Sequence, residues 1–415
     1  MANRVRILIS AYACEPGKGS EPGVGWHVST EMAHHFQVTV LTRANNREVI
    51  EKALAKVSGP KPDFIYYDLP GWVMWLKRKT SLISVYYTIW QFAVRWRLRD
   101  KISEYNLIHH VTFNGFQLPG FWIGTDCQVV LGPLGGGMVY PPNFVRAMGS
   151  GWISEKLRGF VVKLSTLNPL TRMSLCSADK VLAANRETAK VIGNVSGERP
   201  ELMLETGYRI DVGQGLYREP DKEDDLIKVL WVGGLVPRKA PLLAIEATRV
   251  AIKRGARIRL DIVGGGPLEG ELRRLASGAD SKWLVCHGQV PHEETRRFFA
   301  QADVFLFTSL RDTSGNVVLE AMAHGLPVVV PDHQGVALIC SEDQAIKVPV
   351  DSPKQLLDGI ADALVRLSTD SGLRQSMGKR SRDRLLSHWS WEGYGRKMGE
   401  IYQKCLSVGA GAERE

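Results

Sequence analysis

Residues 311–329 read RDTSGNVVLEAMAHGLPVV, and this stretch predicts more of the fold than any other part of the chain. It follows the apolar run 304–307, whose length and composition are typical of a buried strand. A polar turn centred on Gly315 comes next, and residues 316–324 then have the pattern of a helix. Gly325 stands directly after the last turn, where glycine commonly ends a helix. Strand, turn and helix in this order predict one unit of a parallel α/β sheet.

Two carboxylates lie in this stretch, Asp312 in the turn and Glu320 inside the predicted helix. The N–H groups that open a helix are unpaired, and the helix dipole places positive charge beside them. Gly315, Asn316 and Val317 therefore suit a phosphate group. A carboxylate one turn further in can accept hydrogen bonds from ribose hydroxyls, so the stretch has the features of half a nucleotide-sugar site. The alternative is an ordinary strand, turn and amphipathic helix with a solvated Asp and Glu.

The stretch resembles the signature of retaining glycosyltransferases of family 4. The second half of that signature is matched well by Glu320-Ala-Met-Ala-His-Gly-Leu-Pro-Val-Val. The first acidic position is usually Glu in the family, whereas this chain has Asp312. The resemblance implies the GT-B fold, an α/β architecture with two Rossmann-like, doubly wound parallel-sheet domains that face a central cleft. It also implies that Asp312 contacts the donor sugar and that Glu320 contacts the ribose.

The rest of the chain has the pattern of two such domains. Its 415 residues, 44% hydrophobic and 23% charged, are typical of a globular protein long enough for two domains. Short apolar runs alternate with helical patterns, which predicts parallel sheets with right-handed crossovers. These runs are too many for one ordinary sheet, so two sheets are expected. The runs are 5–10, 38–42, 64–68, 107–111, 129–132 and 180–184, then 228–232, 259–263, 283–287, 304–307, 327–330 and 346–350.

The predicted division gives an N-terminal acceptor domain, 1–207, and a C-terminal nucleotide-sugar domain, 208–393. A terminal helix, 394–408, is expected to return to the first domain, as it does in the resembling family. The N-terminal sequence MANRVRILISAY enters a strand directly and lacks the layout of a signal peptide. This pattern predicts a cytosolic protein.

Three further segments of the second domain are similar to elements of the same family. Residues 233–239, GGLVPRK, follow a strand run and place Arg238 beside Lys239, where the two cations could neutralise a diphosphate. The family usually has Arg where this chain has Gly234. Residues 263–268, VGGGPL, resemble a VGxGP turn. Gly288 and Val290 belong to a GxVP-like turn, whose backbone in the family contacts the nucleobase.

The first domain is expected to supply the other wall of the cleft. Residues 21–26, EPGVGW, resemble the family's glycine loop, so Gly23 is predicted to lie against the donor diphosphate at the start of a helix, 26–34. His109 and His110 end a strand run, where α/β folds place ligands. We predict that they are catalytic together with Asp312. The alternative for His109 is a core histidine bonded to a backbone carbonyl.

The stretch 71–99 suggests how the acceptor is reached, within a chain of net charge +9. It has no acidic residue, and aromatic side chains are interleaved with its cations, Lys77, Arg78, Lys79, Arg95, Arg97 and Arg99. Such a mixture suits an anionic membrane surface, although the low-charge part, 80–94, is too short and too polar to cross a bilayer. Two alternatives stay open. One is a nucleic-acid contact, which no accompanying motif supports, and the other is a buried helix with solvated basic ends.

Taken with the resemblance, these patterns predict a retaining, metal-independent glycosyltransferase without a cofactor. Its co-substrate would be a nucleoside-diphosphate sugar, with UDP and GDP undecided, and its acceptor a hydroxyl of a bacterial-type polysaccharide or lipid-linked glycan. No Asp-x-Asp motif is present to hold a metal. A non-catalytic nucleotide-sugar-binding relative and a GT-B epimerase remain alternatives. An NAD-linked oxidoreductase is disfavoured because residues 264–270, GGGPLEG, are not a GxGxxG fingerprint.

Overall fold

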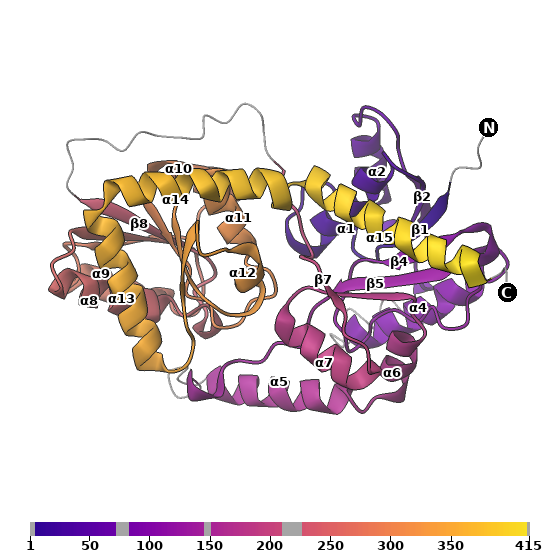
Figure 1. Ribbon diagram of the computed structural model, residues 1–415, viewed down its shortest axis with the longest axis horizontal. Helices are drawn as coiled ribbons and strands as arrows, with labels where there is room; N and C mark the ends of the chain where they lie inside the picture. The colour runs from indigo at the N-terminus through magenta and orange to yellow at the C-terminus, as the bar shows by residue number, and fades with distance from the viewer. Residues whose placement is uncertain (1–4, 72–82, 145–150, 210–225, 413–415) are drawn as a thin grey trace. The chain divides into compact units, whose positions relative to one another are not determined.

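The computed structural model describes residues 5–71, 83–144, 151–209 and 226–412 (Figure 1). The chain divides into two compact units. Unit 1 consists of Met1–Gly137, Val162–Gly207 and Trp391–Glu415, and unit 2 of Met138–Val161 and Tyr208–Ser390. The segment Met138–Val161 thus groups with the second unit, although it lies inside the predicted first domain.

Unit 1 contains a parallel sheet with seven strands among its described residues. In spatial order these are β3 (Asp63–Tyr66), β2 (Gln37–Thr42), β1 (Arg6–Ser10), β4 (Leu107–His110), β5 (Gln128–Leu134), β6 (Lys180–Ala183) and β7 (Glu201–Leu202). The central strands are buried on both faces, as expected for a sheet covered by helices on either side, and β4 ends with two histidines.

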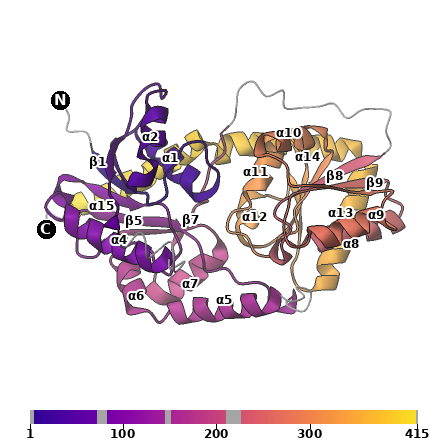
Figure 2. The same ribbon diagram turned by 180° about the vertical axis from the view of Figure 1, so that it is seen from behind.

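Helices cover both faces of the unit 1 sheet. Side chains of α1 (Ser20–Met32) and α15 (Trp391–Ala412) share one hydrophobic core with β1 and β4. Side chains of α4 (Ile83–Leu98) and α7 (Arg186–Ser196) pack in the core on the other face, which is in front in Figure 2. The remaining elements of the unit are η1 (Ala44–Asn46), α2 (Arg47–Leu54), η2 (Ile102–Glu104) and α6 (Pro169–Cys176). The helix α5 (Trp152–Ser165) begins in unit 2 and ends in unit 1.

Unit 2 contains a parallel sheet with six strands in the part of the chain that the structure describes. In spatial order these are β10 (Leu284–Gly288), β9 (Ile258–Val263), β8 (Ile227–Val232), β11 (Val304–Leu306), β12 (Val328–Pro331) and β13 (Ala345–Val348). Its helical elements are η4 (Pro237–Lys239), α8 (Pro241–Lys253), α9 (Glu269–Ser277), α10 (His292–Gln301), α11 (Asn316–Ala323), α12 (Gln334–Ile339), α13 (Pro353–Thr369), α14 (Ser371–Arg384) and η5 (Leu385–Trp389).

The two sheets confirm the predicted pair of Rossmann-like, doubly wound domains. Each of the twelve predicted runs forms a strand, with bounds that shift by up to two residues. β7 was not predicted, because two residues show no hydrophobic period. The helix predicted at 26–34 was wrong at its start, since α1 begins at Ser20. Gly325 follows α11 with the left-handed φ of 65° that was expected after the last turn.

Candidate functional site

The carboxyl edge of the unit 2 sheet carries the segments that the sequence analysis singled out. Residues 233–239 follow β8, and residues 307–315 follow β11. These two strands are neighbours at the point where the strand order reverses, and open α/β sheets bind ligands at such a point. The turn after β9 lies at the same edge as the end of β10, since Gly264 N–H donates to the Gly288 carbonyl over 2.8 Å. The topology therefore gathers four predicted segments at one edge.

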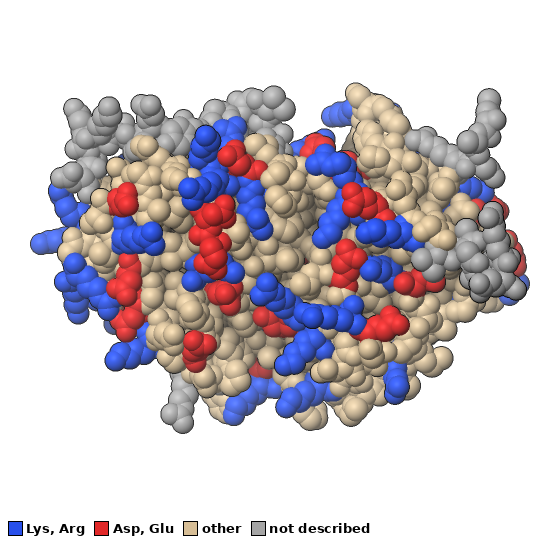
Figure 3. All heavy atoms as spheres, in the orientation of Figure 1, with Lys and Arg blue, Asp and Glu red and all other residues tan. Residues whose placement is uncertain are grey.

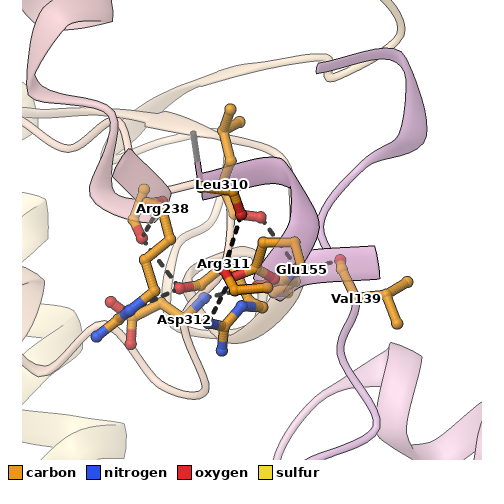
Figure 4. Close-up of polar contacts among 10 residues, drawn as sticks. Val139, Glu155, Arg238, Leu310, Arg311 and Asp312 are labelled. Atoms are coloured by element: carbon orange, nitrogen blue, oxygen red, sulfur yellow. Dashed lines mark hydrogen bonds and ion pairs between the residues drawn. The ribbon is translucent and has the colours of Figure 1, made fainter. Parts of the chain in front are cut away.

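Hydrogen bonds hold η4 against the loop that follows β11 (Figure 4). Arg238 Nη1 donates to the Arg311 carbonyl over 3.0 Å, and Leu310 N–H donates to the Arg238 carbonyl over 3.0 Å. Lys239 Nζ forms an ion pair with Asp312. Each side chain of that pair is about one-fifth exposed, so the two groups orient each other while staying open to a ligand. Lys239, predicted to bind the diphosphate, thus lies beside Asp312, predicted to contact the donor sugar.

An additional pair of charges from α5 joins this edge, and sequence reasoning missed it. Glu155 Oε1 accepts a hydrogen bond from Arg311 Nη2 over 2.7 Å, and the Glu155 side chain is 7% exposed. Burial, followed by the charge of Arg311, lowers the pKa of the Arg158 guanidinium, whereas Glu155 raises it. Arg158 Nε is buried and has no hydrogen-bond partner within the described ranges. The only sequence signal was a polar pair, Glu155 and Arg158, on a helix with large apolar residues on other faces.

We call Glu155, Arg158, Arg238, Lys239, Arg311 and Asp312 the charge cluster. Its four cations exceed its two carboxylates, so these six side chains carry a net positive charge at neutral pH. Clustered cations that are partly removed from water favour an anion, and guanidinium groups match phosphate oxygens in geometry. The arrangement can therefore hold a phosphate group.

The loop that carries Asp312 is hydrogen-bonded to the first residue of α12. Asp312 N–H donates to Gln334 Oε1 over 2.7 Å, and Gln334 Nε2 donates to the Val139 carbonyl over 3.2 Å. The next residue must be glycine, because a Cβ on Gly335 would lie 1.9 Å from the Thr313 carbonyl oxygen. These contacts fix the backbone on which Asp312 stands.

The other predicted donor residues of unit 2 lie on α11 and on the β10 turn. Gly315 is the N-cap of α11 with φ 72°, and the first turn begins with Asn316 and Val317. Asn316 Oδ1 is buried and finds no hydrogen-bond partner among the residues described. Glu320 is half-buried one turn further along the helix.

The turn that follows β10 carries the two residues predicted to lie near the nucleobase. Gly288 has φ 74°, and Val290 is half-buried two residues later. The neighbouring turn must have glycine at 264, because a Cβ there would lie 1.9 Å from the Gly233 carbonyl oxygen. Close packing of these turns brings the Gly288 turn next to 233–239, and a nucleobase contact stays a prediction.

In unit 1, Gly23 lies inside α1 and faces the chain's own backbone. A Cβ on Gly23 would lie 2.1 Å from the Lys18 carbonyl oxygen. The glycine therefore permits a close approach of the preceding loop, and its contact with a diphosphate stays a prediction. Glu21, in the first turn of the same helix, accepts a hydrogen bond from Phe113 N–H over 3.1 Å. Burial raises the pKa of this carboxyl group.

The two histidines of unit 1 are completely buried and bonded on both ring nitrogens. His109 Nδ1 lies 2.5 Å from Tyr402 Oη, and its Nε2 lies 2.6 Å from the Gly132 carbonyl. His110 Nε2 lies 2.7 Å from Tyr87 Oη, and its Nδ1 lies 3.2 Å from Ser10 Oγ. Burial lowers the pKa of His109 to about 4 and that of His110 to about 3. His109 thus has the surroundings of the alternative, a neutral core histidine bonded to a carbonyl, and a catalytic role stays a prediction.

The stretch 71–99 is described from Ile83 onward as α4, while Lys77, Arg78 and Lys79 lie outside the described residues. Within α4, the large side chains Tyr86, Tyr87 and Trp90 are buried in the core of unit 1. Phe92 and Trp96 are exposed, by 46% and 67%. Three of the five aromatic side chains in the described part of this stretch therefore serve packing, as the buried-helix alternative predicted.

Comparison with known proteins shows which proteins the chain is similar to. Residues 227–370 match the family model of glycosyl transferases group 1. The chain is 32% identical over 149 residues to the amylovoran biosynthesis glycosyltransferase AmsK of Erwinia amylovora, covering 34% of this chain and 36% of that protein. It is 26% identical over 359 residues to a GDP-mannose-dependent phosphatidylinositol monomannoside mannosyltransferase of Mycolicibacterium smegmatis, covering 78% and 90% of the two chains. The amylovoran relative and two putatively named colanic acid glycosyltransferases are matched over about a third to a half of their own lengths, 36%, 52% and 45%.

Solved structures show the same fold along nearly the whole chain. Sucrose-phosphate synthase from Thermosynechococcus elongatus is similar with a TM-score of 0.61 at 19% identity, covering 98% of this chain and 100% of that one. HepE from Anabaena, in complex with UDP, is similar with a TM-score of 0.61 at 12% identity, covering 96% and 100%. The predicted GT-B glycosyltransferase fold is therefore confirmed, whereas membership of family 4 in particular stays a prediction.

Proposed function

We propose that this chain is a retaining glycosyltransferase that moves a sugar from a nucleoside-diphosphate sugar to a hydroxyl of a bacterial-type polysaccharide or lipid-linked glycan. The observation that carries the proposal is the charge cluster beside the first turn of α11, at the switch point of the unit 2 sheet. Cations and helix N–H groups there can hold the diphosphate. They also stabilise the negative charge that develops on it as the glycosidic bond breaks.

In the proposed reaction, three residues of the charge cluster and Glu320 of α11 contact the donor. Arg238 and Lys239 bind the diphosphate, Asp312 contacts the donor sugar, and Glu320 accepts from the ribose hydroxyls. The departing phosphate takes the proton of the acceptor hydroxyl, so the reaction needs neither an enzymic nucleophile nor a metal. The ion pair of Lys239 with Asp312 supports this assignment, because a residue proposed to bind the diphosphate then lies beside one proposed to contact the sugar.

The acceptor and the location are further parts of the proposal. The names of the amylovoran, colanic acid and phosphatidylinositol mannoside relatives support a glycan or glycolipid acceptor. Within the described ranges, no helix combines the length and the hydropathy that crossing a bilayer requires. We propose that the protein works at the inner face of the membrane, with residues 71–99 contributing a peripheral contact. The exposed Phe92 and Trp96 support that contact.

A non-catalytic nucleotide-sugar-binding protein is the second candidate. It is favoured by the complete burial of His109 and His110, because neither imidazole is exposed to a substrate. Transfer or hydrolysis of the donor separates the two candidates, because a binding protein would do neither. A GT-B epimerase would instead change the configuration of the donor sugar, which chromatography of the recovered nucleotide sugar detects.

The diphosphate assignment predicts a specific pattern of ligand stabilisation. A panel of UDP-, GDP- and ADP-sugars should contain one that raises the melting temperature, since a ligand at 100 times its Kd adds about 2.7 kcal/mol. The variant Arg238→Ala should bind that nucleotide more weakly by about 1.5–3 kcal/mol, because a charge-assisted hydrogen bond is lost. Isothermal titration calorimetry measures the difference. Arg297→Ala, which removes an arginine from an exposed face of α10, is the matched control. Unchanged affinity in both Arg238→Ala and Lys239→Ala would refute the assignment.

The ribose assignment predicts the behaviour of Glu320→Gln. This change keeps the size of the side chain and weakens a charge-assisted hydrogen bond, so kcat/KM should fall by about tenfold while the melting temperature is retained. A donor with 2′,3′-dideoxyribose should discriminate little between the variant and the wild type. Glu294→Gln, at an exposed position on α10, is the control. If exchanging the ordinary donor for the dideoxy donor costs the variant as much affinity as it costs the wild type, Glu320 is not the ribose ligand.

A further inference from the structure

One face of helix α5 is apolar and points into solvent. Its large side chains are more than half exposed: Ile153 61%, Leu157 62%, Phe160 62% and Leu164 56%, followed after the helix by Leu167 at 78%. Their spacing of three and four residues places them along one stripe. We call these five residues the α5 stripe.

The opposite face of α5 is the one that turns toward the protein, and it carries mostly polar or small residues. Glu155 is buried in its ion pair with Arg311, Arg158 and Gly159 are half-buried, and Val162 is the one large apolar residue that is buried there. A surface helix of a soluble globular protein has the reverse arrangement, with its apolar stripe toward the core. Isolated exposed apolar residues are ordinary, but a continuous stripe marks a contact surface.

The charges around the stripe are positive. Between residues 151 and 176 the only acidic residue is Glu155, which is buried, whereas Lys156, Lys163 and Arg172 are exposed. In Figure 3 the lower edge, over α5 and α6, shows blue and tan atoms with little red. Trp152 begins the helix with Lys156 Nζ 4.6 Å from its ring centre, and an aromatic ring paired with a cation suits the headgroup level of a bilayer.

We propose that the α5 stripe docks on the surface of an anionic lipid bilayer, with the helix lying in the plane of the membrane. The apolar side chains enter the boundary between headgroups and acyl chains, while Lys156 and Lys163 contact lipid phosphates. This surface is separate from 71–99, and it rests on exposure and charge rather than on the proposed transfer reaction.

A second copy of the chain fits the stripe less well than a bilayer does. The helix has 14 residues, about two heptads, whereas coiled coils are recognised by three to four or more. The positions that flank the stripe on one side are both lysine, so a symmetric pair would gain no complementary charge across it. An anionic surface satisfies both lysines at once.

Sedimentation with lipid vesicles tests the proposal on the full chain. The probes are vesicles of phosphatidylcholine alone and of phosphatidylcholine mixed with phosphatidylglycerol. The test variant is Leu157→Ser combined with Phe160→Ser and Leu164→Ser. The matched control is Val49→Ser combined with Leu386→Ser, which removes exposed apolar side chains from α2 and η5. All three positions of the test variant are exposed, so its melting temperature should equal that of the wild type.

The wild type and the control should bind the anionic vesicles better than the neutral ones, and less well as salt is raised. The test variant should lose about tenfold or more in its partition coefficient, since each buried apolar group adds to the binding. Equal binding of variant and wild type would overturn the proposal. Wild-type protein that binds anionic vesicles no better than neutral ones would overturn it as well. Self-association of the lipid-free wild type that the variant abolishes would also overturn it, in favour of a second copy. Transfer to a short soluble acceptor is measured in parallel, so failure of docking and failure of the proposed function give different results.

Discussion

Replacing Glu155 with alanine should destabilise unit 2 by about 3–5 kcal/mol, the range for a buried ion pair that loses one partner. The Glu155 side chain is 7% exposed and that of Arg311 is 18% exposed, so neither charge is well solvated. Without the carboxylate, the Arg311 guanidinium would face that of Arg158, whose pKa burial and Arg311 already lower. Differential scanning calorimetry should show the loss as a lower transition temperature.

The control for this prediction is Glu48→Ala, which removes a carboxylate from an ion pair on α2 that is mostly exposed on both sides. Exposed pairs contribute little, so its transition should stay within error of the wild type. The same variant also tests nucleotide binding. If the charge cluster binds a diphosphate, the nucleotide found in the panel should stabilise Glu155→Ala at least as much as the wild type, because the cations remain. A variant as stable as the control would contradict the structural role of Glu155.

Unit 1 should lose stability as the pH falls from about 6.5 to about 4. His109 has a folded pKa of about 4, below its ordinary value of 6.5, so between these values the unfolded chain binds a proton that the folded chain excludes. The difference corresponds to about 3 kcal/mol for His109 alone, fully lost below pH 4, and His110 acts in the same direction. Above pH 6.5 both forms are neutral and the stability should be flat with respect to these groups. Calorimetry over this range of pH measures the slope.

The variant His109→Gln separates this cause from general acid denaturation. A glutamine can still bond to polar neighbours but takes up no proton, so its stability should fall less steeply between pH 6.5 and 4. It should also be less stable at neutral pH, because the bonds to Tyr402 and Gly132 are fitted to an imidazole. His35→Gln, at an exposed position, should keep the wild-type slope. Parallel slopes for His109→Gln and wild type would show that His109 does not control the acid response.

Much of the unit 2 site could be predicted from sequence because its parts are local. A strand run, a glycine turn and a helix start are each set by neighbouring residues, and the loops after parallel strands meet at one sheet edge. The sequence therefore predicts that Arg238, Lys239 and Asp312 lie at one edge, and the structure pairs Lys239 with Asp312. The glycine loop of unit 1 was less predictable. Gly23 is required because the Lys18 carbonyl of the preceding loop lies against it. A glycine that a ligand requires would give the same sequence pattern.

The amino-acid sequence by itself determined the two parallel sheets, the order of their strands along the chain and the glycine turns at the carboxyl edge of the unit 2 sheet, because hydrophobic period and glycine position act over a few residues. Only the tertiary structure decided that Glu155 meets Arg311 and that His109 meets Tyr402, pairs separated by 156 and 293 residues. It also decided that the apolar stripe of α5 faces solvent. A period shows that a helix has two faces, but which face is buried, and which histidine is held neutral, depends on what the folded chain packs against it.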